Sequence, residues 1–443
     1  MIRYSLIPLV VLAAAVPVAA QRRAAADDLS KEIEARTEQV TPKVIAWRRD
    51  IHQHPELSNR EVRTAKLVAD HLRSLGLEIR TGVAHTGVIG VLQGGKPGPV
   101  VALRADMDGL PVTELADVPF KSTVRTTYNG QEVGVMHACG HDNHVAIVMG
   151  VAEILAGMKA SIPGTVKFIF QPAEEFPPAG EEGGAPMMVR EGALEHPRPA
   201  AIFGLHVWPE PVGTIHYRPG PTMSASNSLS IVVKGRQTHG AVPWGGVDPI
   251  AVSSQIVLAL QTIVSRQINL TVAPAVITIG MIQGGNRGNI IPDSVVMLGT
   301  IRTFDENTRK DIFDRIRRTA DDIAKSAGAT ATVNIWGYGL VTYNDPALTE
   351  RMVPSLKRAA GDANVAVTKL VSASEDFPAF TQTIPGLYFF LGIVPKGQDL
   401  NTVPRNHSPF FVIDEAALPV GVRAMANLAV DFLKTAGKPS SGM

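Results

Sequence analysis

The chain contains very little cysteine: a single residue, Cys139, among 443. One cysteine cannot form an intrachain disulfide, so the fold does not depend on disulfide bonds. A lone thiol is then a buried apolar side chain, a link to another chain, a nucleophile or a metal ligand. The residues around Cys139 have to distinguish between these roles.

The chain also lacks an excess of positive or negative charge. It contains 42 Lys and Arg residues and 41 Asp and Glu residues, for a formal net charge of +1. This balance provides no basic surface for a polyanion, and we expect no nucleic-acid partner. No internal repeat of solenoid length is found. With 45% hydrophobic residues, a chain of this length can bury more than one core, so two domains are expected.

The N-terminus has the pattern of a secretory signal peptide, predicted over residues 1–20. An apolar run from Leu6 to about Val18 is followed by small residues and a cleavage position near Ala20. A membrane anchor is the alternative, but Pro8 and Pro17 interrupt the run, which falls short of the roughly 20 apolar residues of a span. We therefore expect a periplasmic or secreted protein with no membrane attachment after cleavage.

The spacing of apolar residues predicts an α/β fold with a second domain inserted into it. Strand-like apolar runs alternate with helical patterns over residues 30–223 and again over residues 339–436, which favours a largely parallel, covered sheet. Residues 224–338 follow the order βαββαβ of a ferredoxin-like unit. In the first segment, a helix is predicted from His144 to about Lys159.

Metal-ligating residue types stand near the ends of several predicted strands. The runs "FIFQPAEE" and "IFGLHVWP" carry such side chains, as do "MHACGHDNH" and the loop "PRNHSPF" before the last helix. Taken singly, each is an ordinary core histidine, solvated turn or buried thiol. Their joint occurrence predicts a metal site, structural or catalytic, of the kind that suits zinc. The candidates are Cys139, His141, Glu174, Glu175, His206 and His407.

Ten ordered motifs give the chain a family resemblance from about Ile45 to Phe432. They are "RRDIHQHPELSNRE", "ALRADMDGLP", "MHACGHDNH", "FIFQPAEE", "GLHVWP", "HGAVP", "GNIIPD", "GTIRTFD", "SASEDF" and "NHSPFF". This order resembles the M20 metallopeptidases, and within them the amidohydrolase branch of hippurate, auxin-conjugate and N-acyl-amino-acid hydrolases. The resemblance implies a zinc-peptidase-like α/β catalytic domain with an inserted ferredoxin-like lid, through which the protein forms a homodimer.

The resemblance also implies a site for two divalent ions. Cys139 would bridge both ions, His141 and His206 would complete one coordination set, and Glu175 with His407 the other. Zinc or manganese is expected, with nickel or cobalt as alternatives. A thiolate between two cations is held deprotonated, which makes this arrangement chemically sensible.

The same resemblance assigns the residues that would act on the substrate. Glu174 would be the general base for a water activated by the metals, although spacing alone leaves open the reverse roles of Glu174 and Glu175. Asp106 and Asp108 stand where other branches have a His-x-Asp motif that supplies a ligand, and they are expected to orient ligands instead. This departure assigns the missing ligand to His141.

The inserted domain would contribute three further residues. By resemblance, His239 would stabilise the oxyanion, reaching across the dimer, while Asn289 and Arg302 would bind the substrate carboxylate. Without the resemblance, Arg302 is equally well a strand residue that points to solvent. Trp244 follows "HGAVP" where relatives commonly have histidine, so substrate choice is the part that the motifs define least.

These observations predict an exported metal-dependent amidohydrolase that cleaves N-acyl or N-aroyl amino acids such as hippurate or N-acetyl amino acids. The alternatives are a metallo-carboxypeptidase or dipeptidase and a silent metal-binding relative, but a silent relative has no need of Glu174. Catalysis by Cys139 as nucleophile would leave both glutamates, His206 and His407 without roles.

Overall fold

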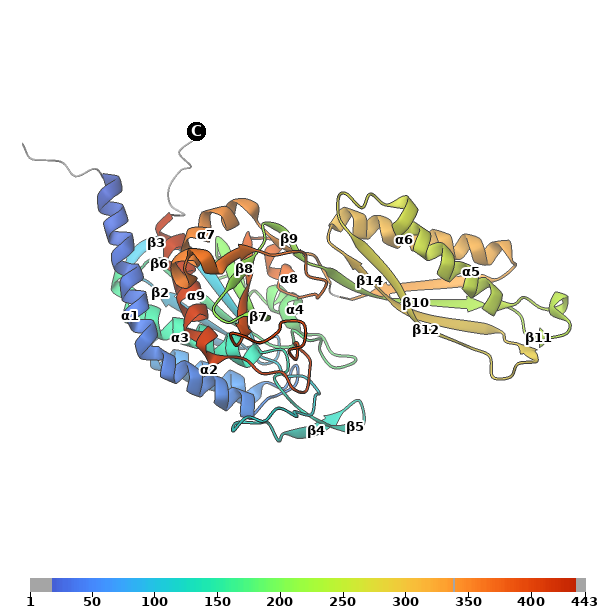
Figure 1. Cartoon of the computed structure of the whole chain (residues 1–443), viewed down its shortest axis with the longest axis horizontal. Helices are drawn as coiled ribbons and strands as arrows, with labels where there is room; N and C mark the ends of the chain where they lie inside the picture. The colour runs from blue at the N-terminus through green and yellow to red at the C-terminus, as the bar shows by residue number, and fades with distance from the viewer. Residues whose placement is uncertain (1–17, 338, 436–443) are drawn as a thin grey trace, which may run out of the picture.

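The computed structural model describes residues 18–337 and 339–435, with side chains from Leu29 onward. The predicted signal peptide therefore lies outside the described residues, except for three residues of backbone at its end. Two bodies are visible in Figure 1: a large one built from both ends of the chain, and an elongated one that protrudes from it. The predicted α/β fold class is confirmed.

An eight-stranded sheet forms the centre of the large body, in the order β1-β2-β6-β3-β7-β18-β8-β17. Its strands are β1 (Glu78–Val83), β2 (Gly87–Gln93), β3 (Lys96–Asp106), β6 (Pro163–Gln171), β7 (Ala201–Pro211), β8 (Ile215–Tyr217), β17 (Val365–Val367) and β18 (Gly386–Val394). Four central strands, β6, β3, β7 and β18, run parallel to one another.

The sheet is less parallel than the sequence predicts. β1 pairs antiparallel with β2, β2 pairs antiparallel with β6, and β8 pairs antiparallel with β18. β2 and β6 are both mostly apolar, although Lys167 interrupts the run of β6, and such runs indicate burial on two faces without indicating strand direction. The prediction of a largely parallel sheet thus holds for the centre and is wrong for the flanking strands.

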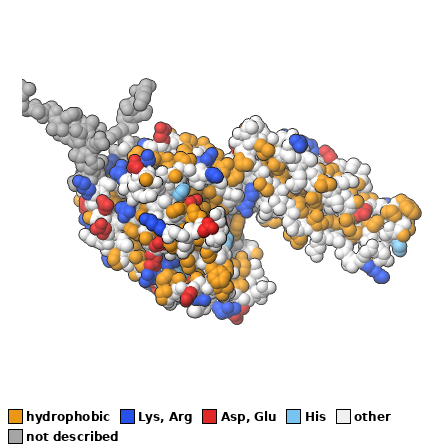
Figure 2. All heavy atoms as spheres, viewed as in Figure 1, with side chains coloured by type: hydrophobic (Ala, Val, Ile, Leu, Met, Phe, Trp, Pro, Cys, Tyr) orange, Lys and Arg blue, Asp and Glu red, His pale blue; other side chains and the backbone are white. Residues whose placement is uncertain are grey.

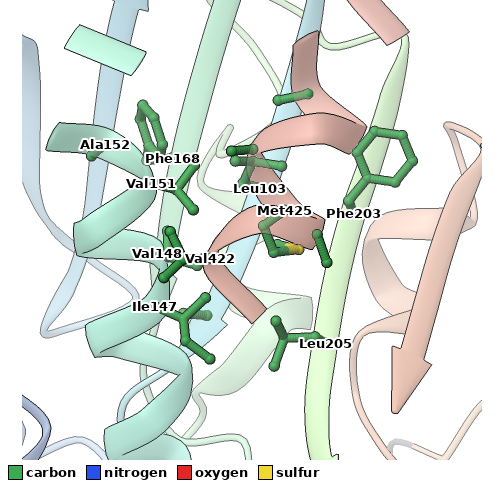
Figure 3. Packing of buried hydrophobic residues seen from close by; sticks show 14 of the residues in the cluster. Leu103, Ile147, Val148, Val151, Ala152, Phe168, Phe203, Leu205, Val422 and Met425 are labelled. Atoms are coloured by element: carbon green, nitrogen blue, oxygen red, sulfur yellow. The ribbon is translucent and has the colours of Figure 1, made fainter. Parts of the chain in front are cut away.

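One face of the sheet is covered by α1 (Val18–Gln53), α2 (Val62–Ser74), α3 (His141–Gly157), α7 (Pro346–Ala360) and α9 (Leu418–Thr435). Alternate strand residues face these helices, among them Leu103, Phe168 and Phe203, which belong to one core cluster with Met425 of α9 (Figure 3). At about 1.5–3 kcal/mol for each large apolar side chain, this layer is the main source of stability.

The residues in between point to the opposite face and pack against shorter helices. Ala102, Ile169 and Ile202 belong to a second cluster with α4 (Gly184–Arg190) and α8 (Pro378–Thr381). The sheet is therefore buried on both sides, as the continuous apolar strands predict.

The last helix is apolar as well as long. Of the residues that the structure describes, one segment, Glu415–Thr435, passes a length and hydropathy test for a membrane span, and 78% of its apolar window is buried inside the protein. It lies against α1, α3 and α7 in the core (Figure 1). That burial accounts for its composition as a core helix of the folded body.

The protruding body has the predicted order βαββαβ. Its strands β10 (Ala225–Lys234), β12 (Ala275–Gly284), β14 (Ser294–Thr303) and β15 (Thr330–Trp336) form an antiparallel sheet in the order β12-β14-β10-β15. Helices α5 (Pro249–Thr262) and α6 (Glu306–Ser326) pack on one face of it. We call this body the lid; its sheet order is that of the ferredoxin-like unit.

The lid has two ends with different surroundings. At the root, Ser226 pairs with Arg302 close to the points where the chain enters and leaves the large body. At the other end, which we call the tip, β11 (Thr238–His239) pairs with β13 (Ile290–Ile291). From Ser226 to Lys234 the extended strand β10 spans roughly 27 Å, at about 3.4 Å per residue, so root and tip are well separated (Figure 1).

Candidate active site

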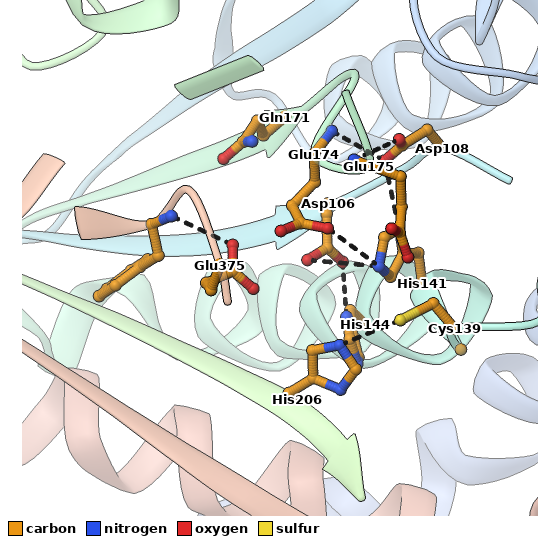
Figure 4. A network of polar contacts seen from close by, with 12 residues as sticks. Asp106, Asp108, Cys139, His141, His144, Gln171, Glu174, Glu175, His206 and Glu375 are labelled. Atoms are coloured by element: carbon orange, nitrogen blue, oxygen red, sulfur yellow. Dashed lines mark hydrogen bonds and ion pairs between the residues drawn. The ribbon is translucent and has the colours of Figure 1, made fainter. Parts of the chain in front are cut away.

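Side chains from distant parts of the chain meet at the carboxyl ends of the central parallel strands. Asp106 ends β3, the pair Glu174 and Glu175 follows β6, and His206 lies in the second half of β7 (Figure 4). Parallel strands bring their carboxyl ends to one edge of a sheet, which is where α/β proteins bind ligands. The predicted convergence at strand ends is present.

The turn before α3 places Cys139 and His141 in this group. Gly140, between them, has a φ of 95°, a left-handed conformation that L side chains rarely adopt. A Cβ atom on Gly140 would also lie only 2.4 Å from Cγ2 of Val207. Glycine is therefore required here, and α3 begins at His141 instead of the predicted His144.

Two ligand triads share Cys139. In each triad the ligand atoms lie within 4.8 Å of one another: Cys139, His141 and His206 form the first, and Cys139, Glu175 and His407 the second. Sγ of Cys139 is 3.4 Å from Nε2 of His206, and Nε2 of His407 is 2.9 Å from a carboxylate oxygen of Glu175. The structure thus brings together all five predicted ligands, with the thiol common to both sets.

Hydrogen bonds to the outer nitrogens orient two of the imidazoles. Nδ1 of His206 lies 2.7 Å from the carbonyl oxygen of Val207, so it donates, and Nε2 is left with its lone pair toward Cys139. Nδ1 of His141 lies 3.2 Å from Asp108, while its buried Nε2 has no hydrogen-bond partner among the described residues. An inward-facing imidazole nitrogen without a hydrogen-bond partner, such as Nε2 of His141, fits metal coordination.

The two aspartates of β3 and its following turn hold this group in place. Asp108 accepts hydrogen bonds from the backbone N–H groups of Glu174 (3.1 Å) and Glu175 (2.9 Å) in addition to its contact with His141. Asp106 bonds Nδ1 of His144 at 2.5 Å, and Nε2 of His144 accepts from the backbone of β7. Because both nitrogens of His144 are engaged, this side chain connects β3 to β7 and is not free to bind an ion.

Glu174 faces a second acidic cluster. Its carboxylate lies within 4.8 Å of those of Glu375 and Asp376, and its Oε2 is 3.8 Å from Nε2 of His141. Arg104, which is completely buried in β3, bonds Glu375 (2.7 Å) and Asp376 (3.1 Å) from below. Glu174 therefore lies between the ligand triads and a braced pair of carboxylates.

Buried carboxylates around Cys139 and His141 shift the pKa values of these two side chains in a way that bound cations would reverse. Burial, together with Glu175 and Glu174, raises the pKa of the Cys139 thiol well above its usual range. Burial alone would lower the pKa of His141, but Asp106 and Asp108 outweigh it and raise this pKa to about 10. Without cations, the Cys139 thiol and the His141 imidazole therefore retain their protons. Bound divalent ions would favour the deprotonated forms of both side chains instead.

Glu174 also has an unusual electrostatic environment. Burial, and after it the neighbouring carboxylates of Glu375 and Glu175, raise the pKa of Glu174 well above its usual range. A carboxyl group that readily holds a proton is suited to accept one and return it during a reaction.

A pocket of about 400 Å³ opens over this group. Its lining includes four of the candidate ligands, Cys139, Glu175, His206 and His407, together with Glu174. Much of its wall is apolar, and these side chains are Phe176, Pro177, Pro186, Trp208, Pro209 and Met223. A mostly apolar cavity with a few convergent polar groups is the usual form of a small-molecule site.

Only the root of the lid lies at this pocket, and the tip does not. Arg302, at the root, lines the pocket, and its buried Nη1 has no hydrogen-bond partner among the described residues. His239 and Asn289 lie together at the tip, where the backbone N–H of Gly240 bonds the carbonyl of Asn289. The structure therefore brings Arg302 to the site and leaves the other two predicted lid residues far from their own pocket.

Glu375 and Asp376 were expected to brace the site and Asp142 to orient ligands, but three of their buried partners, Arg48, His52 and Arg104, were given no role by the sequence. Arg104 sits inside an apolar strand, and Glu375 is 271 positions away along the chain. Asp142, beside His141, is bonded by Arg48 (2.8 Å) and His52 (3.0 Å) of α1. The motifs "ALRAD" and "RRDIHQHP" contain these residues, but a motif alone does not indicate which residues it contacts.

Comparison with known proteins agrees with this geometry. Residues 102–431 match peptidase family M20/M25/M40. Thermostable carboxypeptidase 2 of Saccharolobus solfataricus is 41% identical over 408 residues, which cover 91% of this chain and 99% of that protein. N-acetylcysteine deacetylase of Bacillus subtilis is 38% identical over 395 residues, covering 89% and 97% respectively.

A solved structure is similar over the same length. The YXEP protein of Bacillus subtilis, described as a dinuclear metal binding peptidase from the M20 family, is 36% identical and superimposes with a TM-score of 0.73. The likeness covers 90% of this chain and 99% of that one, so it includes the large body and the lid together.

Proposed function

This chain belongs to peptidase family M20/M25/M40 and is a metal-dependent hydrolase acting on amides, and from that premise we propose that it cleaves N-acyl or N-aroyl amino acids. One observation carries the proposal. Two ligand triads meet at Cys139 beside a carboxyl group that is not needed for either, Glu174, in the lining of an apolar-walled pocket.

The donor set suits two divalent ions. His141 and His206 would hold one ion and Glu175 with His407 the other, with the Cys139 thiolate between them. The unpartnered Nε2 of His141 and the raised pKa of the thiol support this assignment, since both call for a cation. When bound, such ions polarise the scissile carbonyl and lower the pKa of a water molecule. Zinc or manganese fits the mixed sulfur, nitrogen and oxygen ligands.

Glu174 is the proposed general base. Glu175 is engaged with His407, whereas Glu174 turns toward Glu375 and Asp376 (Figure 4). This difference favours Glu175 as ligand over the reverse assignment that spacing leaves open. Glu174 would accept a proton from the attacking water and deliver it to the leaving amine nitrogen, and its raised pKa suits both transfers.

Arg302 is the proposed partner of the substrate carboxylate. Its guanidinium nitrogen Nη1 is buried at the pocket without a described partner, and burial lowers the pKa of Arg302. A carboxylate would satisfy this nitrogen and compensate its desolvation. The acyl group of the substrate would then pack against the apolar side chains of Trp208 and Phe176 in the pocket wall.

His239 and Asn289 require a second subunit under this proposal. Nδ1 of the exposed His239 accepts a hydrogen bond from the backbone of Ala241 (3.0 Å), so Nε2 carries the proton and can donate to an oxyanion. The tip is too far from its own pocket. We therefore propose a homodimer in which each tip serves the neighbouring site.

The lid offers a surface for such a dimer. Strand β12 is an edge strand with unpaired backbone groups, and it exposes Val276 (53%) and Ile282 (54%). Leu258 of the adjacent helix α5 is 71% exposed. An open edge flanked by exposed apolar side chains is a place where a second copy can pair.

A carboxypeptidase activity is the second candidate, favoured by the 41% identity to a protein named as one. Both reactions release an amino acid whose carboxylate can bind Arg302, and they differ only in the acyl part. Export also remains a proposal, supported by the pattern of residues 1–20. N-terminal sequencing of protein from a periplasmic fraction, starting near Gln21, would support it.

The proposed function is tested with a substrate panel. Hippurate, N-acetyl amino acids and dipeptides are assayed for released amino acid, with and without a chelator. We expect hydrolysis of acylated amino acids that the chelator abolishes. Preferential cleavage of dipeptides would instead support the carboxypeptidase candidate, and no cleavage by metal-loaded protein would contradict both.

The base assignment is tested with Glu174→Gln. We expect unchanged metal content and a loss of kcat of about 10²–10⁴-fold. Glu182→Gln changes an exposed glutamate on the same loop, paired with Arg190, and serves as the control. Full activity of Glu174→Gln would show that another group takes the proton.

A further inference from the structure

The lid tip presents an exposed tryptophan that the proposed chemistry does not use. Trp244 is 81% exposed, the most of any large apolar side chain in the described residues. It lies on the short turn Pro243–Gly245, five positions after His239. An indole buries 150–250 Å² when it is covered, so leaving it in water at this level is costly.

The loop that carries Trp244 is held in shape. Arg236 and Val247 exchange two backbone hydrogen bonds (2.9 and 3.0 Å) at its base, and Thr238 bonds the carbonyl of Val242. A Cβ atom on Gly246 would lie 2.4 Å from the backbone oxygen of Arg236, so the loop is closely packed there. The indole is therefore presented by an ordered turn, in the manner of a binding residue.

This tip cannot serve its own pocket. Among the described lining residues, the lid contributes Ser226 and Arg302, both at the root. Trp244 and His239 lie beyond the far end of β10, roughly 27 Å along that strand (Figure 1). A surface that covers Trp244 would therefore belong to another molecule.

The mouth of the pocket carries a matching exposed aromatic side chain. Phe176 lines the pocket and is 55% exposed, and it also borders a small hollow beside Leu110 and Pro111. Its φ of 76° is unusual for a non-glycine residue and turns the chain directly after Glu175. Figure 2 shows hydrophobic side chains exposed on both bodies of the molecule.

We propose that, in the dimer, the partner subunit's Trp244 packs against Phe176 and completes the apolar wall of the acyl pocket. This inference rests on the homodimer of the proposed function and adds a residue to it. A side chain from the other subunit then contributes to the choice of acyl group in each pocket. Aromatic acyl groups gain the most binding energy, because they can stack on the added indole.

Trp244→Ala tests the selection. We expect kcat/KM for hippurate to fall about tenfold relative to that for N-acetylglycine, since the lost contact is apolar and concerns the aroyl group. Trp336→Ala, which removes a lid tryptophan that is 52% exposed at the root, is the matched control and should leave the ratio unchanged. An unaltered ratio in Trp244→Ala, with an intact dimer, overturns the proposal.

Complementation tests whether Trp244 acts from the other subunit. Trp244→Ala and Glu174→Gln are co-expressed with different affinity tags and purified through both tags. In the heterodimer, the one site with an intact Glu174 receives the unaltered tip of the Glu174→Gln chain. A wild-type substrate ratio is therefore expected, whereas the ratio of Trp244→Ala would place the indole in its own chain's pocket and overturn the proposal.

A second heterodimer tests the proposed exchange of lid tips independently of the role of Trp244. The heterodimer of His239→Ala and Glu174→Gln should recover activity that neither homodimer has. Failure there contradicts the exchanged tips altogether. Recovery there, combined with an altered ratio in the Trp244 pair, contradicts only the role of the indole.

Fluorescence provides a readout that does not depend on turnover. Acrylamide quenching of the wild-type dimer is compared with that of Trp244→Phe, and the difference reports on the indole of Trp244. We expect this component to be shielded. Quenching as efficient as that of free tryptophan would overturn the proposal.

Discussion

Cys139 belongs to both ligand triads, so it is the residue whose chemistry decides metal binding. We predict that Cys139→Ser loses more than 100-fold in metal affinity and loses activity with it, because a serine hydroxyl does not ionise as a thiol does. Metal content after dialysis and hydrolysis of the substrate panel measure the two effects.

A graded control accompanies this variant. Ser58 donates a hydrogen bond of 2.7 Å to Asp108, which in turn orients His141. Ser58→Ala should lower metal affinity by only about tenfold, as is usual for residues behind the ligands. Two equivalents of tightly bound metal in active Cys139→Ser would refute the bridging role.

Glu61, which lies beside Ala173 and close to Asp108, provides a prediction of pH dependence. It is fully buried, and burial, with the charge of Asp108, raises its pKa from 4.5 to about 8. The folded state then binds more protons than the unfolded state between these values, so stability falls as pH rises from about 4.5 to 8. The contribution is at most about 5 kcal/mol.

Glu61→Gln should remove this part of the pH dependence. Gln retains the oxygen that accepts from the backbone of Asn59 and Ala173. We expect the difference in thermal midpoint between wild type and variant to grow steadily in favour of the variant from pH 5 to pH 8. Glu34→Gln, at an exposed position on α1, is the control, and parallel curves for wild type and Glu61→Gln would contradict the assignment.

The candidate ligands could be named from the sequence because they stand in motifs with a fixed order, and the structure brings them together. Of the residues that hold them, Asp106 and Asp108 were expected to orient ligands, but the contacts of the others could not be predicted. Arg104 is a charged side chain inside an apolar strand, and only folding shows that Glu375 and Asp376 surround it. The sequence places His144 at the start of a helix but does not show that it connects two strands, because the groups that bind its two nitrogens come from β3 and β7.

Among the elements, the start of α3 bears most directly on the site. Gly140→Ala would impose a side chain on a φ of 95° and bring its Cβ to 2.4 Å from Val207. We predict a loss of about 3 kcal/mol in the free energy of unfolding, together with weaker metal binding, because the turn directs both Cys139 and His141.

Gly130 is the matched control for that turn. It has a φ of 76° in the loop between β4 (Arg125–Tyr128) and β5 (Gln131–Gly134), and its Cβ would meet nothing within 4 Å. Gly130→Ala should cost only about 1 kcal/mol and leave metal binding unchanged. Equal effects of the two substitutions, measured by denaturant unfolding, would show that the contact with Val207 is unimportant.

The long elements could be predicted because their periodicity is local. The helices of the lid and its four strands lie where the apolar spacing places them. Strand direction in the large sheet could not be predicted, since β2 and β6 read alike whether they run parallel or antiparallel. The short strands β8, β9 (Gly220–Met223), β16 (Thr342–Asn344) and β17 lack a pattern long enough to detect.

For the whole molecule, the proposed dimer predicts that activity depends on association. Ile282→Glu places a charge on the exposed edge strand β12 and should convert the dimer to a monomer. Activity should then fall at least about 100-fold, because removing one oxyanion donor costs that much. Light scattering with size-exclusion chromatography measures the mass.

Another edge strand supplies the control. Val367 is 59% exposed on β17, at the edge of the large sheet. Val367→Glu should leave both mass and activity unchanged. A fully active monomer of Ile282→Glu would contradict the exchange of lid tips.

The C-terminal helix has a consequence for how the protein is made. α9 packs against α1, and Ser30 bonds Asn427 across 397 positions of sequence. In a chain synthesised from its N-terminus, the lid is complete long before α9 is synthesised. Until then, the apolar side chains of α3 and the central strands that pack against α9 stay exposed. A chain that stops early leaves these side chains exposed to chaperones and proteases. Loss of α9 is therefore expected to expose the apolar face of α1 and α3 and to destabilise the whole large body.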